Sequence, residues 1–249
     1  MNLKNYRTSE NETKRLESIL SLIPENCKTA LDVGARDGFH VSNMADRFEE
    51  ITALDLTTPE ISIKNVECVA GDIRKLQFSD NSFDMVFCAE VLEHIPEEFL
   101  GVACSELARV SKKYLMIGVP YKQDTRVGRL VCQNCKKINP PWGHVNEFDE
   151  KKLLSLFQGL IVEKIELVGK GGRKTNFLTV FLRSIAGYPY GTYHQDEPCI
   201  YCNSKMICPS HISFVQKTLC FVAKKLEKTQ NRIIRKDPHW IHILFSKNS

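Results

Sequence analysis

The sequence predicts an α/β fold with an open, mostly parallel sheet and helices on both of its faces. Three observations support this prediction. Strand-like and helix-like segments alternate from residue 10 to residue 157, which is typical of a doubly wound sheet. Several of the expected strands are followed by an acid, and the first also leads into a glycine-bearing loop. The 249 residues are enough for one domain with a sizeable core and an appendage.

The expected elements can be placed in chain order. Strands are predicted near 29–33, 51–55, 65–69, 84–88 and 113–119, and helices near 10–22, 39–48, 96–110 and 149–157. Only about ten residues separate Asp55 from Val66, so the usual crossover helix is very short or absent there. Residues 160–168 and 177–183 read as two further strands joined by the turn 169–174, which predicts a terminal antiparallel hairpin.

The loop after the first expected strand is the most informative segment. The strand ends in Asp32, and Gly34 and Gly38 follow in the pattern Asp-x-Gly-x-x-x-Gly. Glycines let a ligand approach the backbone closely, and the N–H groups of the next helix face the same site. The spacing differs from the Gly-x-Gly-x-x-Gly loop that holds a dinucleotide pyrophosphate. A carboxylate here suits a cationic ligand such as the amino group and sulfonium of S-adenosylmethionine.

The next strand ends supply further ligand candidates. Asp55 ends the second strand, where a carboxylate can hold two ribose hydroxyls. Asp72 follows the third strand and is placed to contact an adenine amino group. The complete set of cofactor candidates is Asp32, Gly34, Gly38, Asp55, Leu56, Asp72, Ile73 and Cys88.

These motifs, together with the run from Ala89 to Pro96, resemble the class I S-adenosylmethionine-dependent methyltransferases over residues 28–185. Within that class they are most similar to the type 11, ubiquinone O-methyltransferase-like group. The resemblance implies a Rossmann-like, seven-stranded sheet that is mostly parallel and ends in an antiparallel hairpin. It also implies a methyltransferase domain over 1–185, with an insertion at about 120–148.

The run from Glu90 to His94 is similar to the same run in ubiquinone-type O-methyltransferases and small-RNA 2′-O-methyltransferases. The resemblance implies a second divalent metal bound by Glu90, Glu93, His94 and a later histidine, here His144. Alternatively, His144 acts without metal as a general base or as a hydrogen-bond donor to the acceptor, or it is a structural histidine or a zinc ligand. In other family members the run only closes the cofactor pocket. The catalytic candidates are therefore His144, His94 and Glu90.

Two Cys-x-x-Cys pairs, Cys132 with Cys135 and Cys199 with Cys202, follow the fifth strand. Two such pairs in a reducing compartment indicate four thiolates around one structural zinc ion. The alternatives are unliganded or redox-active cysteines, and the run 208–211, Cys-Pro-Ser-His, can supply a substitute ligand. Since ligands bind beyond the carboxyl ends of parallel strands, this small zinc-binding appendage is expected beside the acceptor pocket as a lid or wall.

Two segments follow the expected domain. Residues 186–212 form a cysteine-rich segment that completes the zinc site with 132–135, and 213–249 form a basic amphipathic helix and tail. From residue 214 onward the tail has eight Lys or Arg against two acids. It is expected either to pack on the core with a solvated face or to rest on an anionic membrane through the helix and 240–245.

The function expected from these features is methyl transfer from S-adenosylmethionine to an oxygen of a small molecule or a glycan precursor. The alternatives are an RNA 2′-O-methyltransferase and a non-catalytic, zinc-bearing interaction module. Nucleic acid is a disfavoured partner, because the formal net charge is only +4 and the tail alone accounts for +6, which leaves the rest of the chain at −2 without the broad positive charge of an RNA binder. The polar first 18 residues and the lack of a long apolar run predict a cytoplasmic protein, possible also at the inner face of a membrane.

Overall fold

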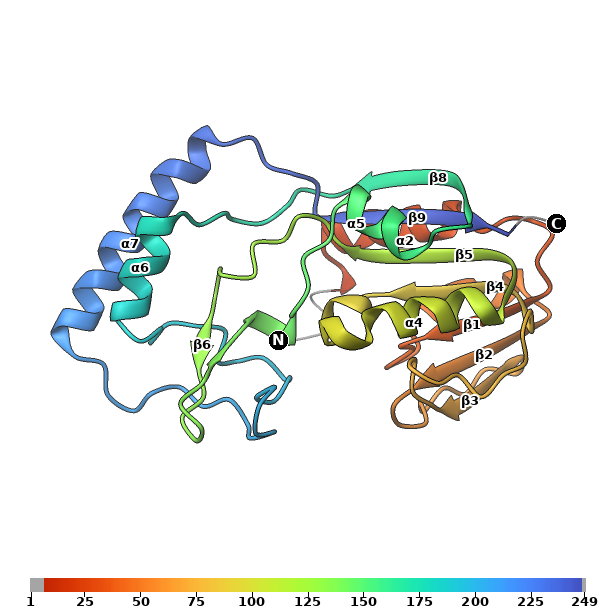
Figure 1. The fold of residues 1–249 in the computed structure, drawn as a ribbon, viewed down its shortest axis with the longest axis horizontal. Coiled ribbons are helices and arrows are strands. Elements are labelled where there is room, and N and C mark those ends of the chain that lie inside the picture. Colours follow the sequence, from red (N-terminus) through yellow and green to blue (C-terminus); the bar gives the residue numbers. More distant parts are fainter. Residues whose placement is uncertain (1–6, 248–249) are drawn as a thin grey trace.

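A seven-stranded sheet forms the centre of the molecule in the computed structural model, which describes residues 7–247. The strand order is β3-β2-β1-β4-β5-β9-β8, and the first five of these are parallel (Figure 1). Strand β9 runs antiparallel between β5 and β8. The strands are β1 (Thr29–Val33), β2 (Glu50–Asp55), β3 (Val66–Ala70), β4 (Phe83–Ala89), β5 (Ser111–Pro120), β8 (Ile161–Val168) and β9 (Trp240–Ser246). The predicted fold class is confirmed.

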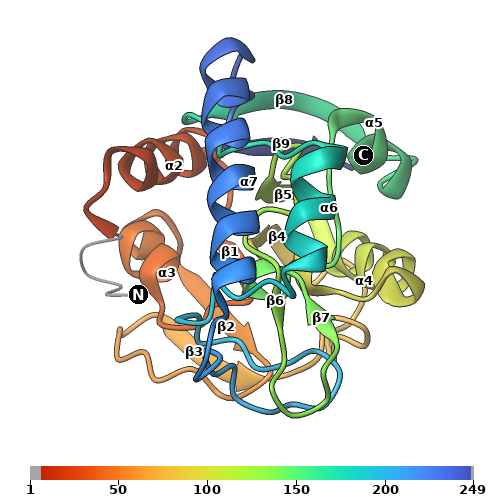
Figure 2. The ribbon, with the colours of Figure 1, turned by 90° about the vertical axis from the view of Figure 1, so that its left-hand side faces the viewer.

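Helices cover both faces of the sheet (Figure 2). Helices α2 (Glu10–Ser21) and α3 (Phe39–Met44) pack on one face, where the core includes Ile19 and Val41. Helices α4 (Glu97–Val110) and α5 (Glu150–Leu156) pack on the other. As the short spacing predicted, no helix connects β2 to β3.

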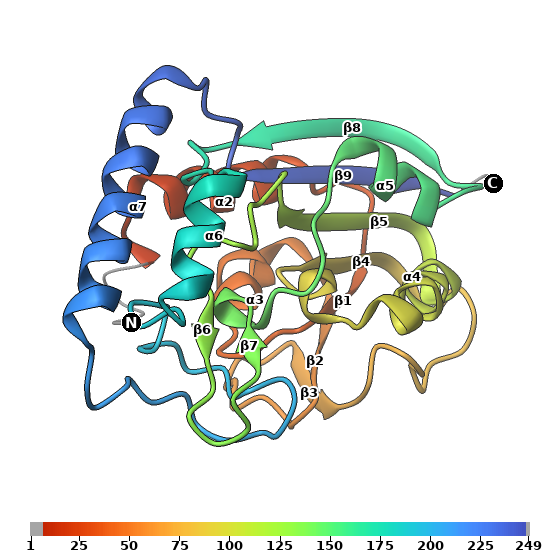
Figure 3. The same cartoon turned by 60° about the vertical axis from the view of Figure 1, so that its left-hand side comes forward.

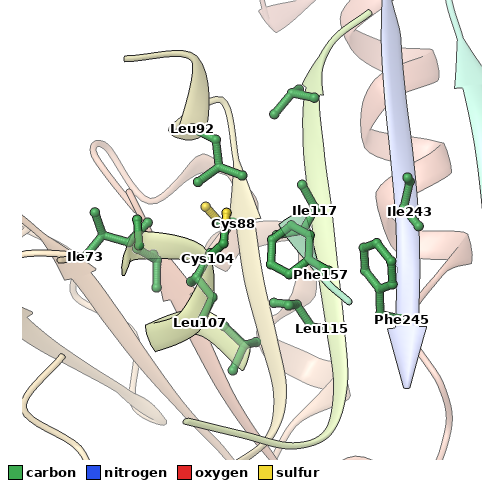
Figure 4. Close-up of a cluster of buried hydrophobic side chains, with 14 of the residues drawn as sticks. Ile73, Cys88, Leu92, Cys104, Leu107, Leu115, Ile117, Phe157, Ile243 and Phe245 are labelled. Carbon is green, nitrogen blue, oxygen red and sulfur yellow. The ribbon is translucent and has the colours of Figure 1, made fainter. Parts of the chain in front are cut away.

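The core under α4 illustrates why these segments adopt their structure. Helix α4 buries residues at helical spacing, among them Cys104 and Leu107, and all seven residues of β4 are buried, as expected for a central parallel strand. Figure 4 shows these helix side chains against Cys88 and Leu115 of the sheet. Truncating Leu107 to alanine would leave a cavity that costs about 2–5 kcal/mol.

The predicted terminal hairpin is wrong in its second strand. Residues Phe177–Ile185 form helix α6, which begins at a capping box between Asn176 and Thr179. The apolar residues of this segment recur at helical spacing, and the position beside β8 belongs to β9 instead. The sheet is therefore completed by a strand that lies far beyond residue 185.

The C-terminal segment agrees with its prediction in the helix and differs in the residues that follow it. Helix α7 (Phe214–Ile233) agrees with the expected amphipathic helix. Residues 240–245, which were expected to be able to rest on a membrane, instead form the buried part of β9, where Trp240 is 1% exposed. The membrane role of this short segment is excluded because β5 and β8 enclose it.

An appendage lies beyond the carboxyl ends of the parallel strands (Figures 1 and 3). It contains α6, α7 and the two-stranded sheet of β6 (Leu130–Val131) and β7 (Ile138–Asn139). Within residues 7–247, no helix has the length and apolar character needed to span a bilayer.

Candidate functional site

The loop after β1 requires glycine at two positions. Gly34 and Gly38 have φ angles of +85° and +72°, a region that favours glycine. A Cβ at Gly34 would lie 2.3 Å from Cγ2 of Val91, and one at Gly38 would lie 2.6 Å from the side chain of Ile61. The loops after β1 and β4 and the β2–β3 connection therefore meet at this edge of the sheet.

Asp32 is a buried acid near the end of β1. The residue is 2% exposed, and its Oδ2 atom has no hydrogen-bond partner among the described residues. Burial, with the charge of Asp55 as the second cause, raises the pKa of Asp32 to about 7. A cationic ligand group at this position would satisfy the carboxylate.

Asp55 is held in place at the end of β2. One carboxylate oxygen accepts a hydrogen bond from the N–H of Arg36 at 2.9 Å, and the other accepts one from the N–H of Leu56 at 2.7 Å. Each oxygen keeps a further lone pair that can accept a ligand hydroxyl. The Leu56 side chain is 75% exposed beside it. This geometry suits a ligand that presents two neighbouring hydroxyls.

The side chains of the remaining cofactor candidates are paired or buried and are less available to a ligand. Asp72 is paired with the guanidinium of Arg74, and the hydrogen bond from Arg74 lowers the pKa of Asp72. Ile73 belongs to the core under α4. The thiol of Cys88 is fully buried in the same core, so only its backbone is available at the end of β4 (Figure 4).

Glu90 forms an ion pair with Arg15 that the sequence did not reveal. Its backbone is left-handed, with φ of +60°, and its Oε2 atom lies 3.2 Å from Nη1 of Arg15. Arg15 comes from α2 and also binds Glu12 at 2.6 Å, and both residues are buried. The sequence does contain one local signal, because Glu12 and Arg15 lie three residues apart in the expected helix and can form an ion pair there. Only the tertiary structure brings that pair to Glu90.

Glu93, His94 and His144 form a cluster in which ligand atoms lie within 4.8 Å of one another. Glu93 is fully buried, and neither of its carboxylate oxygens has a hydrogen-bond partner among the described residues. Burial, and then the neighbouring Glu90, raises the pKa of Glu93 well above its usual range. The two imidazole rings meet edge to face, with centroids 4.7 Å apart. Glu90, predicted as a fourth ligand, is not part of this cluster.

The segment around His144 is fixed to the loop after β4. The N–H of Val145 donates to the carbonyl of Glu93 at 2.8 Å. His144 Nδ1 lies 2.6 Å from Gln123 Oε1, and because an amide oxygen only accepts, Nδ1 carries the hydrogen and Nε2 keeps its lone pair. Burial lowers the pKa of His144 to about 3, so the ring is neutral at pH 7.

The four predicted zinc ligands lie together in the appendage. Cys132, Cys135, Cys199 and Cys202 are free thiols whose sulfur atoms lie within 4.8 Å of one another. Two of the sulfur–sulfur distances are 3.7 and 3.6 Å. A tetrahedron with Zn–S bonds of 2.3 Å has edges of about 3.8 Å, so the spacing fits zinc. Cys208, the predicted substitute, is exposed outside this cluster.

The two cysteine pairs occupy matching turns. The N–H of Lys136 donates to the carbonyl of Cys132, and the N–H of Asn203 donates to that of Cys199, both at 2.9 Å. Lys136 and Asn203 are also both left-handed, with φ of +61° and +56°. Contacts with Ser204 and Asn134 lower the pKa of the Cys202 thiol. Two equivalent turns thus present four sulfurs to one point.

A cavity of about 400 Å³ separates this cysteine cluster from the histidine cluster. It is lined by His94 and Gly143 on one side and by residues 197–203 on the other. Arg36, in the loop after β1, lies 4.0 Å from Glu197. The appendage therefore lies next to the candidate cofactor edge.

Comparison with known proteins finds a methyltransferase domain over part of the chain. Residues 31–114 match the family described as a methyltransferase domain. The chain is 30% identical over 107 residues to a ubiquinone biosynthesis O-methyltransferase from Albidiferax ferrireducens. The match covers 38% of this chain and 42% of that protein. The chain therefore spans less than half the length of the curated relatives it matches.

Solved structures show the same fold. A methyltransferase dependent on S-adenosylmethionine from Archaeoglobus fulgidus superposes with a TM-score of 0.53 at 18% identity, covering 98% of this chain and 97% of that one. A second structure is the 1,6-didemethyltoxoflavin N1-methyltransferase of Burkholderia thailandensis with bound 1,6-didemethyltoxoflavin and S-adenosylhomocysteine. Its TM-score is 0.55 at 15% identity, and the match covers 99% of this chain and 82% of that one. The predicted resemblance is confirmed for domain and fold.

Proposed function

We propose, from the class I S-adenosylmethionine-dependent methyltransferase domain and fold that this chain carries, that it methylates a hydroxyl oxygen of a small molecule or glycan precursor. The observation that carries the proposal is the convergence of Asp32, the Gly34 loop and Asp55 at one strand edge. Asp32 would bind the cofactor's amino group, and Asp55 would bind its ribose hydroxyls. Similarity to ubiquinone O-methyltransferases supports oxygen as the acceptor atom.

The proposed role of the protein in the reaction is placement and proton removal. Bound S-adenosylmethionine supplies a methyl group on a good leaving group. The chain must hold the acceptor oxygen in line and accept its proton. His144 alone is a weak base, because its pKa is about 3 and general bases work best near the operating pH. The neutral ring does keep the Nε2 lone pair free for a metal ion at pH 7.

A divalent cation fits the Glu93, His94 and His144 cluster. Neutral imidazoles together with a carboxylate form an open ligand set, and within residues 7–247 the oxygens of Glu93 have no hydrogen-bond partner. A cation held there would lower the pKa of an acceptor hydroxyl. Chelation should then abolish methyl transfer reversibly while S-adenosylhomocysteine still binds.

The four-cysteine cluster is proposed to hold structural zinc. Four thiolates close the coordination sphere, so the ion would contribute folding energy to the appendage without entering the reaction. The acceptor is proposed to enter the cavity of about 400 Å³ between this module and His94. In that arrangement the zinc module shapes acceptor specificity.

Calorimetry gives the first test of the function. Titration of the purified protein with S-adenosylhomocysteine should show one site per chain, and NAD should produce no binding heat, because the loop lacks the pyrophosphate spacing. Mass spectrometry of ligand that co-purifies with the protein would identify the acceptor class. If S-adenosylhomocysteine gives no heat with folded protein, the proposed function is wrong.

A further inference from the structure

Helices α6 and α7 pack against each other outside the central sheet (Figures 2 and 3). Polar contacts join them: Arg183 donates to both carboxylate oxygens of Glu227 at 2.9 and 2.8 Å, and Gln216 donates to the carbonyl of Ala186 at 2.8 Å. The polar groups between the helices are thus paired with each other. This packing buries Cys220 and Ala223 of α7 but leaves most of the larger apolar side chains of the pair uncovered.

Large apolar side chains project from both helices into solvent. Phe177 of α6 is 84% exposed, and Phe214 of α7 is 83% exposed. On α6 they share one helix face, and on α7 a stripe recurs at helical spacing. The exposed set is Phe177, Leu178, Phe181 and Ile185 on α6, with Phe214, Val215, Phe221, Val222, Leu226 and Ile233 on α7. A surface of this extent marks an interaction site.

The exposed charges on α7 all have one sign. Its exposed cations are Lys217, Lys224, Lys225, Lys228 and Arg232. The single acid of the helix, Glu227, is buried and paired with Arg183. Cations interleaved with apolar side chains complement a surface that is anionic above and apolar beneath.

A cavity of about 630 Å³ opens between the two helices and residues 127–128. Its lining combines cations, including Arg173, Lys217 and Lys224, with the aromatic ring of Phe221. A phosphate group with a hydrocarbon chain attached matches that combination.

We infer that the α6–α7 pair docks on the surface of a lipid bilayer that contains anionic phospholipids. The phosphates would contact the α7 cations, and the exposed apolar side chains would enter the headgroup region. A second copy of the chain fits less well, because pairing two α7 surfaces would bring like charges together. Docking would bring the carboxyl edge of the sheet close to the membrane. A lipid-linked acceptor could then reach the candidate site, an expectation that rests on the proposed function.

Vesicle flotation tests the docking surface directly. The protein should float with vesicles of phosphatidylcholine and phosphatidylglycerol but not with phosphatidylcholine alone. Binding should weaken in 1 M salt, where the screening length falls to about 3 Å. The double variants Phe177→Ser/Phe181→Ser and Lys224→Glu/Lys228→Glu should each lose at least about tenfold in vesicle affinity, since one cation alone contributes about fivefold.

Matched controls separate docking from misfolding. Val102→Ser on α4 and Lys151→Glu on α5 replace exposed residues of the same kinds elsewhere and should keep full vesicle binding. All variants should bind S-adenosylhomocysteine like the wild type. Equal binding to both vesicle types, binding to neither, or a dimer that Phe177→Ser/Phe181→Ser dissolves would overturn the inference. Vesicle binding by a protein that fails to bind S-adenosylhomocysteine would instead reject only the proposed function.

Discussion

The cysteine cluster and the Glu93, His94 and His144 cluster face each other across one cavity, yet they are built in different ways. The cysteines come from two matching turns whose sulfurs already have tetrahedral spacing. The second cluster joins Glu93 and His94, in the loop after β4, to His144 about fifty positions later. The buried carboxylate of Glu93 has no hydrogen-bond partner in the described part of the chain.

This difference is the basis for proposing a structural site at the cysteines and a reactive site at the second cluster. Four thiolates fill the coordination of zinc and leave no position for an acceptor. Two imidazoles and one carboxylate leave positions open, which chemistry at a metal requires. Metal loss should therefore unfold the appendage in the first case and stop methyl transfer in the second.

Loss of the cysteine cluster should have the largest effect. Cys132→Ser should reduce bound zinc from one ion per chain to almost none, because three thiolates bind far more weakly than four. The appendage should lose its thermal transition while the sheet stays folded. Elemental analysis and circular dichroism measure both effects.

Cys208→Ser is the matched control, since that cysteine is exposed and outside the cluster. It should keep full zinc content. A Cys132→Ser protein that retained its zinc would contradict the shared site.

His144→Ala tests the reactive side of the comparison. Methyl transfer should fall by ~10²-fold or more, because the acceptor loses its metal ligand or base. Binding of S-adenosylhomocysteine should be unchanged, and so should the zinc content. His194→Ala, at an exposed histidine of the appendage, should turn over normally. If His144→Ala instead loses zinc or unfolds, the residue is structural.

Asp55→Ala should affect binding and leave both clusters intact. Loss of charge-assisted hydrogen bonds of about 1.5–3 kcal/mol each should weaken S-adenosylhomocysteine binding at least tenfold. Calorimetry measures this, with Asp46→Ala at an exposed acid as the control. Unchanged affinity in a folded Asp55→Ala protein would rule out its role at the ribose.

Asp32 should make S-adenosylhomocysteine binding depend on pH, independently of the two metal-ligand clusters. Because the pKa of Asp32 is raised to about 7 by burial and Asp55, the carboxyl is protonated at lower pH in the free protein. A cationic ligand requires the carboxylate, so affinity for S-adenosylhomocysteine should rise with pH by at most about tenfold per unit below pH 7 and then level off. Asp32→Asn should bind weakly and show a flat profile; a wild-type profile that is flat would argue against this role.

The sequence by itself determined the parallel half of the sheet and the edge that carries the candidate site. Asp32, Gly34 and Asp55 were found because a strand end followed by a glycine loop is a local pattern, set by backbone geometry within a few residues. The same holds for the two Cys-x-x-Cys turns.

Only the tertiary structure decided which distant segments complete these patterns. Residues 240–246 became a strand because β5 and β8 enclose them. Residues 177–185, by contrast, carry a local helix signal, the capping box at Asn176 and apolar residues at helical spacing, which the expected hairpin overlooked. Tertiary packing also explains why Arg15 reaches Glu90 and why Glu90 is absent from the histidine cluster. Long-range contacts are fixed by packing of the whole chain, which no short stretch of sequence records.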